Sequence, residues 1–294
     1  MRAINPRGMP SGGLSLIEGI TPALSLRDAI KLAPLELLGQ DLMDAHGPEF
    51  RVLVKILDPG EAIVFHLHAS DVQVARMKRQ FRGHRLGKDE AYYFLDAPRG
   101  SQPYTHVGLR GGVTKHDLKA AAGRGAEFVL ELSPSFYQQV GEGFFLPAAV
   151  PHRPGTALTL EIQQPSDVYT LLGDDRIYNL IDYDLSYRVG CVNAFRLRPV
   201  PVPGRQRGGE VATIFPIEMC RKFQGRRLRV SDRLVYSESL PFVILIWAGR
   251  GRLNGRTVAA GEEFFVAHDI AAHGIEIDCS GREALEAFTF LPGV

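Results

Sequence analysis

The chain has 294 residues, with 34 basic and 33 acidic side chains and a formal net charge of +1. This near-equal number of basic and acidic side chains argues against nucleic acid as a partner, because nucleic-acid-binding domains usually carry a clear basic excess. A length well beyond ~150 residues predicts two domains or one large unit with a sizeable core.

Three cysteines occur, none in a Cys-x-x-Cys spacing, so neither a disulfide framework nor a zinc ribbon is indicated. The N-terminus lacks the pattern of a signal peptide, and the longest apolar run, Leu240–Ala248, is far shorter than the ~20 residues of a membrane helix. We therefore expect a cytoplasmic protein without a membrane partner.

Residues 1–13 are rich in Gly, Pro and Arg, a composition that predicts a disordered arm. The next segment, residues 24–39, has the apolar spacing of a helix that is interrupted at Pro34 and ended by Gly39. We expect this helical segment to cover the outside of the first folded unit.

Residues 50–95 are rich in β-branched and aromatic side chains, with turn signals at residues 58–60 and 87, which predicts strands. A helix is expected over residues 70–81. A second short helix is predicted to begin at Thr114, because Asp117 follows at the capping-box distance, and to end at Gly123.

His66, His68, Glu90 and His152 carry the chemistry that the sequence predicts. In a strand the two histidines of His-x-His point to the same face, as two ligands of one ion would. Glu90 and His152 both adjoin strand-like apolar segments, and imidazole with carboxylate suits Zn, Fe, Mn or Ni. Taken singly, each histidine of the nine is better read as a core residue.

Two segments form a weak internal repeat. Residues 141–155 and 261–274 both read Gly-Glu-x-Phe-Phe and then reach a histidine, His152 or His273. The pattern indicates that one kind of β-barrel unit occurs twice in the chain. The second copy lacks a His-x-His pair, so one metal site is expected rather than two.

The predicted fold is mainly β, with two cupin-type jelly-roll β-barrels and a few short helices in the N-terminal half. We expect a metal-binding barrel with helical insertions over residues 14–195, a Pro- and Gly-rich linker over 196–210, and a second, metal-free barrel over 211–294. The sequence leaves open whether exposed barrel edges pair two copies into a homodimer.

Residues 24–166 resemble the type I phosphomannose (mannose-6-phosphate) isomerase family of the cupin superfamily, and the C-terminal barrel resembles it loosely. Residues 50–70 are similar to the family's strand pair leading to Gln-x-His-Pro, and residues 87–96 to its Gly-Lys-x-Glu motif. Residues 144–155 resemble its Pro-Ala-Gly-x-x-His motif, and residues 161–167 its Glu-Ile-Gln-Gln-x-Ser-Asp motif. Four motifs occur in the family's order.

The resemblance implies a metal held by His66, His68, Glu90 and His152, most often Zn²⁺ in the family. His66 replaces a glutamine, which gives a three-histidine, one-carboxylate set that also suits Fe²⁺ or Mn²⁺. Lys88 and Glu161 match catalytic positions of the family, although a lysine in a turn and a glutamate paired with an arginine would be structural alternatives. Leu171 departs from the family, which carries an arginine there; Arg153, Arg176 or Arg188 could reach the site instead.

By this resemblance the protein is a metal-dependent isomerase that interconverts an aldose and a ketose, or their phosphates, through a cis-enediolate. Its partner would be a small sugar or sugar phosphate. Two alternatives stay open: a cupin oxygenase, favoured by His66, and a non-catalytic sugar-binding protein, favoured by Leu171. The sequence does not choose the sugar or the native metal.

Overall fold

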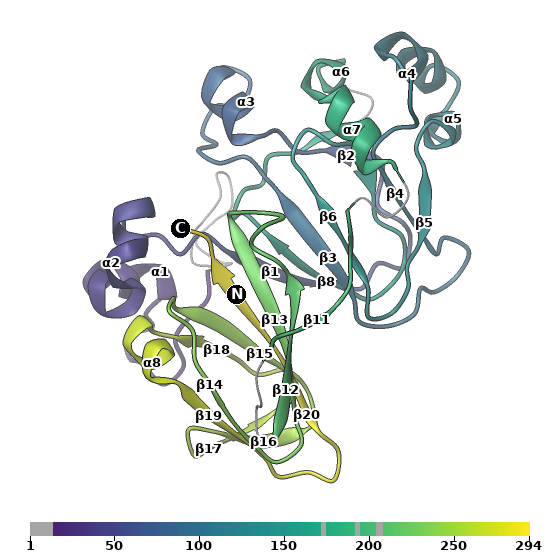
Figure 1. Cartoon of the computed structure of the whole chain (residues 1–294). Coiled ribbons are helices and arrows are strands. Elements are labelled where there is room, and N and C mark those ends of the chain that lie inside the picture. Colours follow the sequence, from purple (N-terminus) through teal and green to yellow (C-terminus); the bar gives the residue numbers. More distant parts are fainter. Residues whose placement is uncertain (1–13, 172–174, 192–194, 204–207) are drawn as a thin grey trace. The chain divides into compact units, whose positions relative to one another are not determined.

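The structure is a computed structural model that describes residues 14–171, 175–191, 195–203 and 208–294. The chain divides into two compact units (Figure 1). The central unit comprises Lys55–Arg198, and the terminal unit comprises the chain up to Val54 together with Pro199–Val294. The predicted arm, residues 1–13, lies outside the described residues.

Two five-stranded sheets make up the central unit. The first has the order β1-β8-β3-β6-β10 and the second the order β5-β4-β7-β2-β9. The strands of the first are β1 (Leu53–Leu57), β3 (Glu90–Phe94), β6 (Gly143–Leu146), β8 (Thr159–Gln163) and β10 (Arg196–Leu197). Those of the second are β2 (His66–Leu67), β4 (Tyr104–Val107), β5 (Ser135–Tyr137), β7 (His152–Arg153) and β9 (Thr170–Leu171).

The core of the central unit joins these two sheets. Tyr92 and Phe94 from β3 and Phe144 from β6 pack in one buried cluster with Val107 from β4, which belongs to the other sheet. Strand β3 is buried along its whole length and pairs on both sides, which explains its aromatic sequence. The arrangement is a sandwich of two open sheets, so that side chains from both can meet in its interior.

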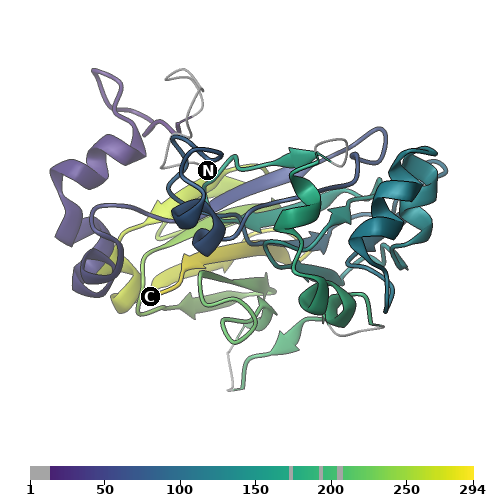
Figure 2. The same cartoon turned by 90° about the horizontal axis from the view of Figure 1, so that it is seen from above.

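Five short helices accompany the central sheets: α3 (Asp71–Arg76), α4 (Lys115–Ala122), α5 (Ala126–Glu131), α6 (Ile177–Leu180) and α7 (Tyr183–Val189). Helices α4 and α5 lie beside each other in both views (Figures 1 and 2). Phe65 and Leu67, which flank His66, pack with Leu118 of α4 and Val129 of α5 in a second buried cluster. The helices thus cover the face of β2 that points away from His66.

Both predicted helical insertions are present. Helix α4 begins after Thr114, whose side chain and that of Asp117 form the expected capping box, and its C-cap is Gly123. Helix α3 also begins with a capping box, at Ser70, but ends at Arg76, earlier than predicted. The last residues of the predicted helix form turns instead.

The terminal unit holds a six-stranded sheet with the order β11-β12-β13-β20-β15-β18 and a four-stranded sheet with the order β14-β19-β16-β17. Strands of the larger sheet are β11 (Val200–Pro201), β12 (Gly209–Phe215), β13 (Phe223–Val230), β15 (Phe242–Ala248), β18 (Glu263–Val266) and β20 (Leu285–Pro292). Those of the smaller are β14 (Arg233–Tyr236), β16 (Arg250–Leu253), β17 (Arg256–Ala259) and β19 (Ile275–Cys279). Its helices are α1 (Leu26–Leu32), α2 (Pro34–His46) and α8 (His268–His273).

The N-terminal helices belong to the terminal unit, whereas the sequence predicted that they cover the first barrel. Helix α2 contacts α8, and the ring of Phe50 packs edge-on against Phe265 of β18 at 5.2 Å. Gly39 does not end the helical segment. It adopts a positive φ of 76°, kinks the chain, and the helix resumes as far as His46.

The predicted linker, residues 196–210, contains the short strands β10 and β11 and the start of β12. Strand β10 pairs with β6 of the central unit, and β11 pairs with β12 of the terminal unit. Residues 204–207 lie outside the described residues. The fold is mainly β and antiparallel, as predicted, but in the described parts of the chain the sheets do not close into barrels.

The internal repeat extends over a turn and a strand. Gly141 and Gly261 both adopt positive φ and lead into β6 and β18 respectively. Beyond these strands the two copies diverge, because His152 lies in β7 whereas His273 ends helix α8. None of the helices in the described ranges is both long and apolar enough to cross a membrane.

Candidate metal centre

Three histidines from two neighbouring strands meet in the interior of the central unit. His66 of β2 lies directly opposite His152 of β7, and in an antiparallel pair such residues project from the same face. His68 follows two residues after His66 and therefore returns to that face. Their ring centroids are 4.3 to 5.2 Å apart, and all three side chains are almost fully buried.

Backbone carbonyls determine the proton position on each imidazole. His66 Nδ1 lies 2.7 Å from the carbonyl oxygen of Val64, and His68 Nδ1 lies 2.7 Å from that of Val168. His152 Nδ1 lies 3.0 Å from the carbonyl oxygen of Val150. A carbonyl oxygen only accepts, so each Nδ1 carries a proton, and Nε2 is the atom of each neutral ring that could bind a metal.

Glu90 reaches the same point from β3 of the facing sheet. Its Oε1 lies 2.9 Å from His152 Nε2, and its Oε2 lies 3.3 Å from His68 Nε2. One ligand atom from each of the four residues can be chosen so that all lie within 4.8 Å of one another. His152 Nε2 is buried and has no hydrogen-bond partner among the described residues.

The donor set fits a divalent cation. A histidine lone pair and a carboxylate oxygen repel each other at 2.9 Å unless positive charge lies between them. Imidazole nitrogen and carboxylate oxygen are ligands of Zn²⁺, Fe²⁺ and Mn²⁺. The structure therefore brings together the four predicted ligands, His66, His68, Glu90 and His152, in an arrangement that could hold one metal ion.

The charge states of these groups suit ligation. Burial lowers the pKa of His66 well below its usual range and lowers the pKa of His68 to about 4, so both rings are neutral near pH 7. Burial by itself would raise the pKa of Glu90, but Lys88, followed by His68 and His152, holds it well below the usual range. Tyr92 donates a hydrogen bond of 2.6 Å to Glu90 Oε1 and helps to orient that carboxylate.

Lys88 and Glu161 lie beside the four ligands. The Lys88 ammonium is 2.6 Å from Glu90 Oε2, 3.1 Å from His68 Nε2 and 3.4 Å from Glu161 Oε1. Burial disfavours its charge, but Glu90 and Glu161 more than compensate and raise the pKa of Lys88. Glu161 lies in β8 and its side chain is buried, and this burial is the main cause that raises the pKa of Glu161. A cation and a carboxylate thus border the four predicted ligands in one buried cluster.

Sequence reasoning missed Lys55, which lies in β1 next to this buried cluster. Its ammonium is 3.4 Å from Glu161 Oε2 and donates a hydrogen bond of 2.6 Å to Gln163 Oε1. Glu161 is therefore held between two lysines. The available signal was a single lysine within the apolar strand at residues 52–57, where a charge needs a partner.

Tyr169 is a second residue that the sequence did not single out. Its ring lies 4.7 Å from the ring of His66 and 5.9 Å from that of His68, measured between centroids. Its side chain is 45% exposed, whereas each predicted ligand is at most 4% exposed. Tyr169 thus stands between the histidines and solvent.

Among the three arginines considered as replacements for the one missing at Leu171, Arg153 faces away from the cluster. Its guanidinium donates to the carbonyl oxygen of Ile63 and to Gln102. Arg176 lines a polar cavity of about 120 Å³ together with Tyr169. Leu171 itself pairs with His66 across β9 and β2 and is 45% exposed.

Gly87 positions the loop that carries Lys88. Its backbone N–H donates to Asp71 at 2.6 Å, and the N–H of Lys88 donates to the carbonyl oxygen of Ala69 at 3.1 Å. A Cβ at position 87 would lie 2.4 Å from the backbone nitrogen of Asp71. Only glycine permits this close approach between the chain after His68 and the chain before Lys88.

No protein-family model matches the chain, and no curated protein sequence matches it. Solved structures do match it. A provisionally assigned mannosephosphate isomerase from Archaeoglobus fulgidus is 13% identical with a TM-score of 0.73, over 92% of this chain and 81% of that protein. The mannose 6-phosphate isomerase from Bacillus subtilis is 17% identical with a TM-score of 0.62, over 85% and 80%.

An arginine-to-alanine variant of phosphomannose isomerase from Salmonella typhimurium is 14% identical with a TM-score of 0.67, over 92% of this chain and 86% of that protein. The likeness thus extends over most of each chain, although few residues are identical. It agrees with the resemblance that the motifs around His66, Glu90 and His152 indicated. The chain has the cupin-type fold of the phosphomannose isomerases.

Proposed function

We propose that the protein is a metal-dependent aldose–ketose isomerase that acts on a small sugar or sugar phosphate. The observation that carries the proposal is the buried cluster in which Glu161 and Lys88 meet the four proposed ligands. A metal held only for stability needs neither a second carboxylate nor a lysine at its edge. Isomerisation needs both a base and a cation at one reacting centre.

Glu161 is the proposed base. It takes the proton from C2 of the aldose; the electron pair of that C–H bond forms the C1–C2 double bond of the cis-enediolate, and the π pair of the C1 carbonyl moves to O1. The C1–C2 π pair then takes the proton back at C1 as the C2–O2 double bond forms. The hydroxyl proton of O2 moves to O1, so that the ketose has the composition of the aldose. Lys55 and Lys88, each 3.4 Å from one Glu161 oxygen, hold the carboxylate in place.

Lys88 is proposed to stabilise the charge that develops on the sugar oxygens, because its ammonium is buried next to the ligand cluster. The metal, proposed to be zinc, would be held by His66, His68, Glu90 and His152 and would supply Lewis acidity toward those oxygens. The three-histidine, one-carboxylate set also accommodates Fe²⁺ or Mn²⁺.

Mannose 6-phosphate is the proposed substrate, since the matched structures of B. subtilis and S. typhimurium carry that activity in their names. The family's arginine is replaced by Leu171. Arg176 is the proposed phosphate ligand, because it lines the polar cavity that is also lined by Tyr169, His84, Thr170 and Asp167. Arg176→Gln is then expected to raise KM for the phosphorylated sugar and to leave metal content unchanged.

The deciding experiment is proton NMR of the protein with mannose 6-phosphate and fructose 6-phosphate in heavy water, with and without a chelator. Exchange of the C1 and C2 protons for deuterium, abolished by the chelator and restored by metal, is the expected result. It reports proton abstraction even when net turnover is slow. No exchange with a full metal load, on either phosphorylated or free sugars, would refute the isomerase proposal.

An oxygenase is the second candidate, because His66 in place of glutamine gives the ligand set with three histidines that the structure brings together. Oxygen consumption by the iron-loaded protein would support it, and metal-dependent proton exchange would not be expected. A non-catalytic sugar-binding protein would bind sugar phosphates without either reaction.

A further inference from the structure

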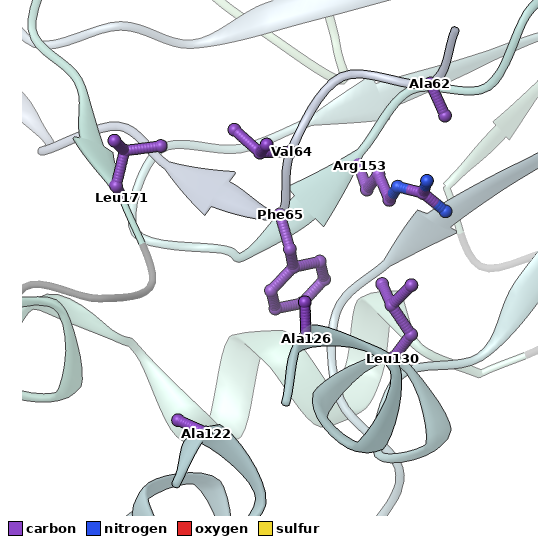
Figure 3. A pocket seen from close by; sticks show the side chains of 8 residues that line it. All are labelled: Ala62, Val64, Phe65, Ala122, Ala126, Leu130, Arg153 and Leu171. Carbon is purple, nitrogen blue, oxygen red and sulfur yellow. The ribbon is translucent and has the colours of Figure 1, made fainter. Parts of the chain in front are cut away.

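A cavity of about 410 Å³ lies beside β2, on the side that faces helices α4 and α5 (Figure 3). Its walls are apolar except for one residue. Phe65 points toward Ala126 and Leu130 of α5, and Leu171 borders the other end. The remaining lining residues are Ala62, Val64, Ala122 and Arg153. The volume lies within the range of ~300–1,000 Å³ that small-molecule sites occupy.

Arg153 supplies the single charge of this cavity. Its Nε and Nη2 donate to neutral acceptors, the carbonyl oxygen of Ile63 and Oε1 of Gln102, each at 3.2 Å. No carboxylate of the described residues forms an ion pair with it, and Nη1 takes part in neither of these hydrogen bonds. A half-buried guanidinium that lacks a counter-charge favours an anionic ligand.

None of the four predicted ligands lines the cavity, although Leu171, one of its wall residues, pairs with His66 in the sheet. His66 and His152 project into the sandwich, whereas Phe65 and Arg153, their neighbours in sequence, project to the opposite face of the same two strands. A molecule in the cavity would therefore contact Phe65 of β2 and Arg153 of β7, and would reach Leu171 of the neighbouring strand β9. The inference does not depend on the reaction proposed above.

We propose that this cavity binds an organic carboxylate with an apolar body, such as a medium-chain fatty acid. The carboxylate would pair with the planar fork of Arg153, and the hydrocarbon chain would lie between Phe65, Leu130 and Leu171. An ion without an apolar body would leave these walls exposed to water, and a neutral hydrocarbon would leave Arg153 without a counter-charge.

The test is calorimetric titration of the full-length, metal-loaded protein with octanoate, and in parallel with octan-1-ol and with inorganic phosphate. Octanoate is expected to bind saturably to one site. Arg153→Gln is expected to weaken it at least tenfold, and Ala126→Trp, which fills the cavity, to abolish it. Arg99→Gln is the matched control, since this exposed arginine of the same unit pairs with Asp58 outside the cavity.

Metal content and the midpoint of thermal unfolding check that each variant folds. Arg153→Lys, which keeps the positive charge but loses the planar guanidinium, should bind octanoate with intermediate affinity. The NMR chemical shifts of the Leu130 and Leu171 methyl groups should change as octanoate is added, in step with its binding. Equal binding of octanoate by the wild type and Arg153→Gln would overturn the proposal. So would equal binding of octan-1-ol, or saturable binding of phosphate that displaces octanoate.

Discussion

At the scale of single residues, the tautomers of three histidines decide what the centre can bind. Each Nδ1 donates to a backbone carbonyl, which leaves Nε2 of each neutral ring as the atom that could bind a metal. Backbone carbonyls, rather than further carboxylates, thus orient the three predicted histidine ligands. Loss of one ligand removes a donor that no neighbouring described side chain replaces.

His152→Ala is expected to lower metal affinity by more than the ~10–100-fold that changes outside the ligand set cost. Metal content after dialysis against a metal-buffered solution, measured by mass spectrometry, checks this. His116→Ala is the matched control, because the His116 side chain on α4 is 91% exposed. Equal metal retention by both variants would show that His152 is not a ligand.

Glu161→Gln is expected to keep the metal and to lower kcat by a factor of ~10²–10⁴, which is the usual contribution of a general base. Glutamine keeps the shape of the side chain but cannot accept the substrate proton. Rates with mannose 6-phosphate, together with metal content, test this expectation. The control is Glu131→Gln, an exposed glutamate of α5; an unchanged rate for Glu161→Gln would remove it from the mechanism.

At the scale of secondary-structure elements, the register of strands and the tightness of one loop assemble the centre. The pairing of His66 with His152 places ligands far apart in sequence next to each other, and β3 brings Glu90 from the facing sheet. A shift of either strand by one residue would turn its ligand to the opposite face. The loop around Gly87 then sets the position of Lys88.

Gly87→Ala is expected to destabilise the protein by ~1–3 kcal/mol, as other overpacked buried sites do, and to reduce activity by displacing Lys88. Urea denaturation and kcat measure the two effects. Gly60→Ala offers a matched control in the same unit, since a Cβ there meets nothing within 4 Å. If the two variants behave alike, the close approach at position 87 does not matter.

At the scale of the whole molecule, all four predicted ligands belong to the central unit. A metal that binds only the folded state stabilises it by an amount set by its free concentration and affinity, ~4 kcal/mol at a thousandfold excess over Kd. Chelation should therefore act on the part of the chain that holds the ligands.

Hydrogen exchange before and after chelation is the measurement. Amides of β2, β3 and β7 are expected to lose protection, while those of β13, β15 and β20 in the terminal unit keep theirs, because no ligand lies in those strands. A uniform loss across both units would indicate instead that the metal stabilises the chain as a single cooperative block.

Local chemistry could be predicted from the sequence alone. The capping box at Thr114 depends on residues three positions apart, and the common face of His66 and His68 on residues two positions apart, so neither needs tertiary information. The predicted ligands also follow from local sequence: the chain has only nine histidines, and each of the four predicted ligands adjoins a strand-like segment. The mainly β class followed from the pattern of apolar residues.

Tertiary structure alone decided the rest, because it depends on contacts between residues distant in sequence. Lys55 lies 106 positions before Glu161 in the printed sequence, and only the pairing of β1 with β8 brings the two within 3.4 Å. His273 ends helix α8 and does not lie in a strand, as the repeat had suggested. Helix α8 packs on α2, so the N-terminal helices belong to the terminal unit. The free energy gained by burying apolar faces determines which helices and strands pack together, and no local sequence pattern encodes which faces will meet.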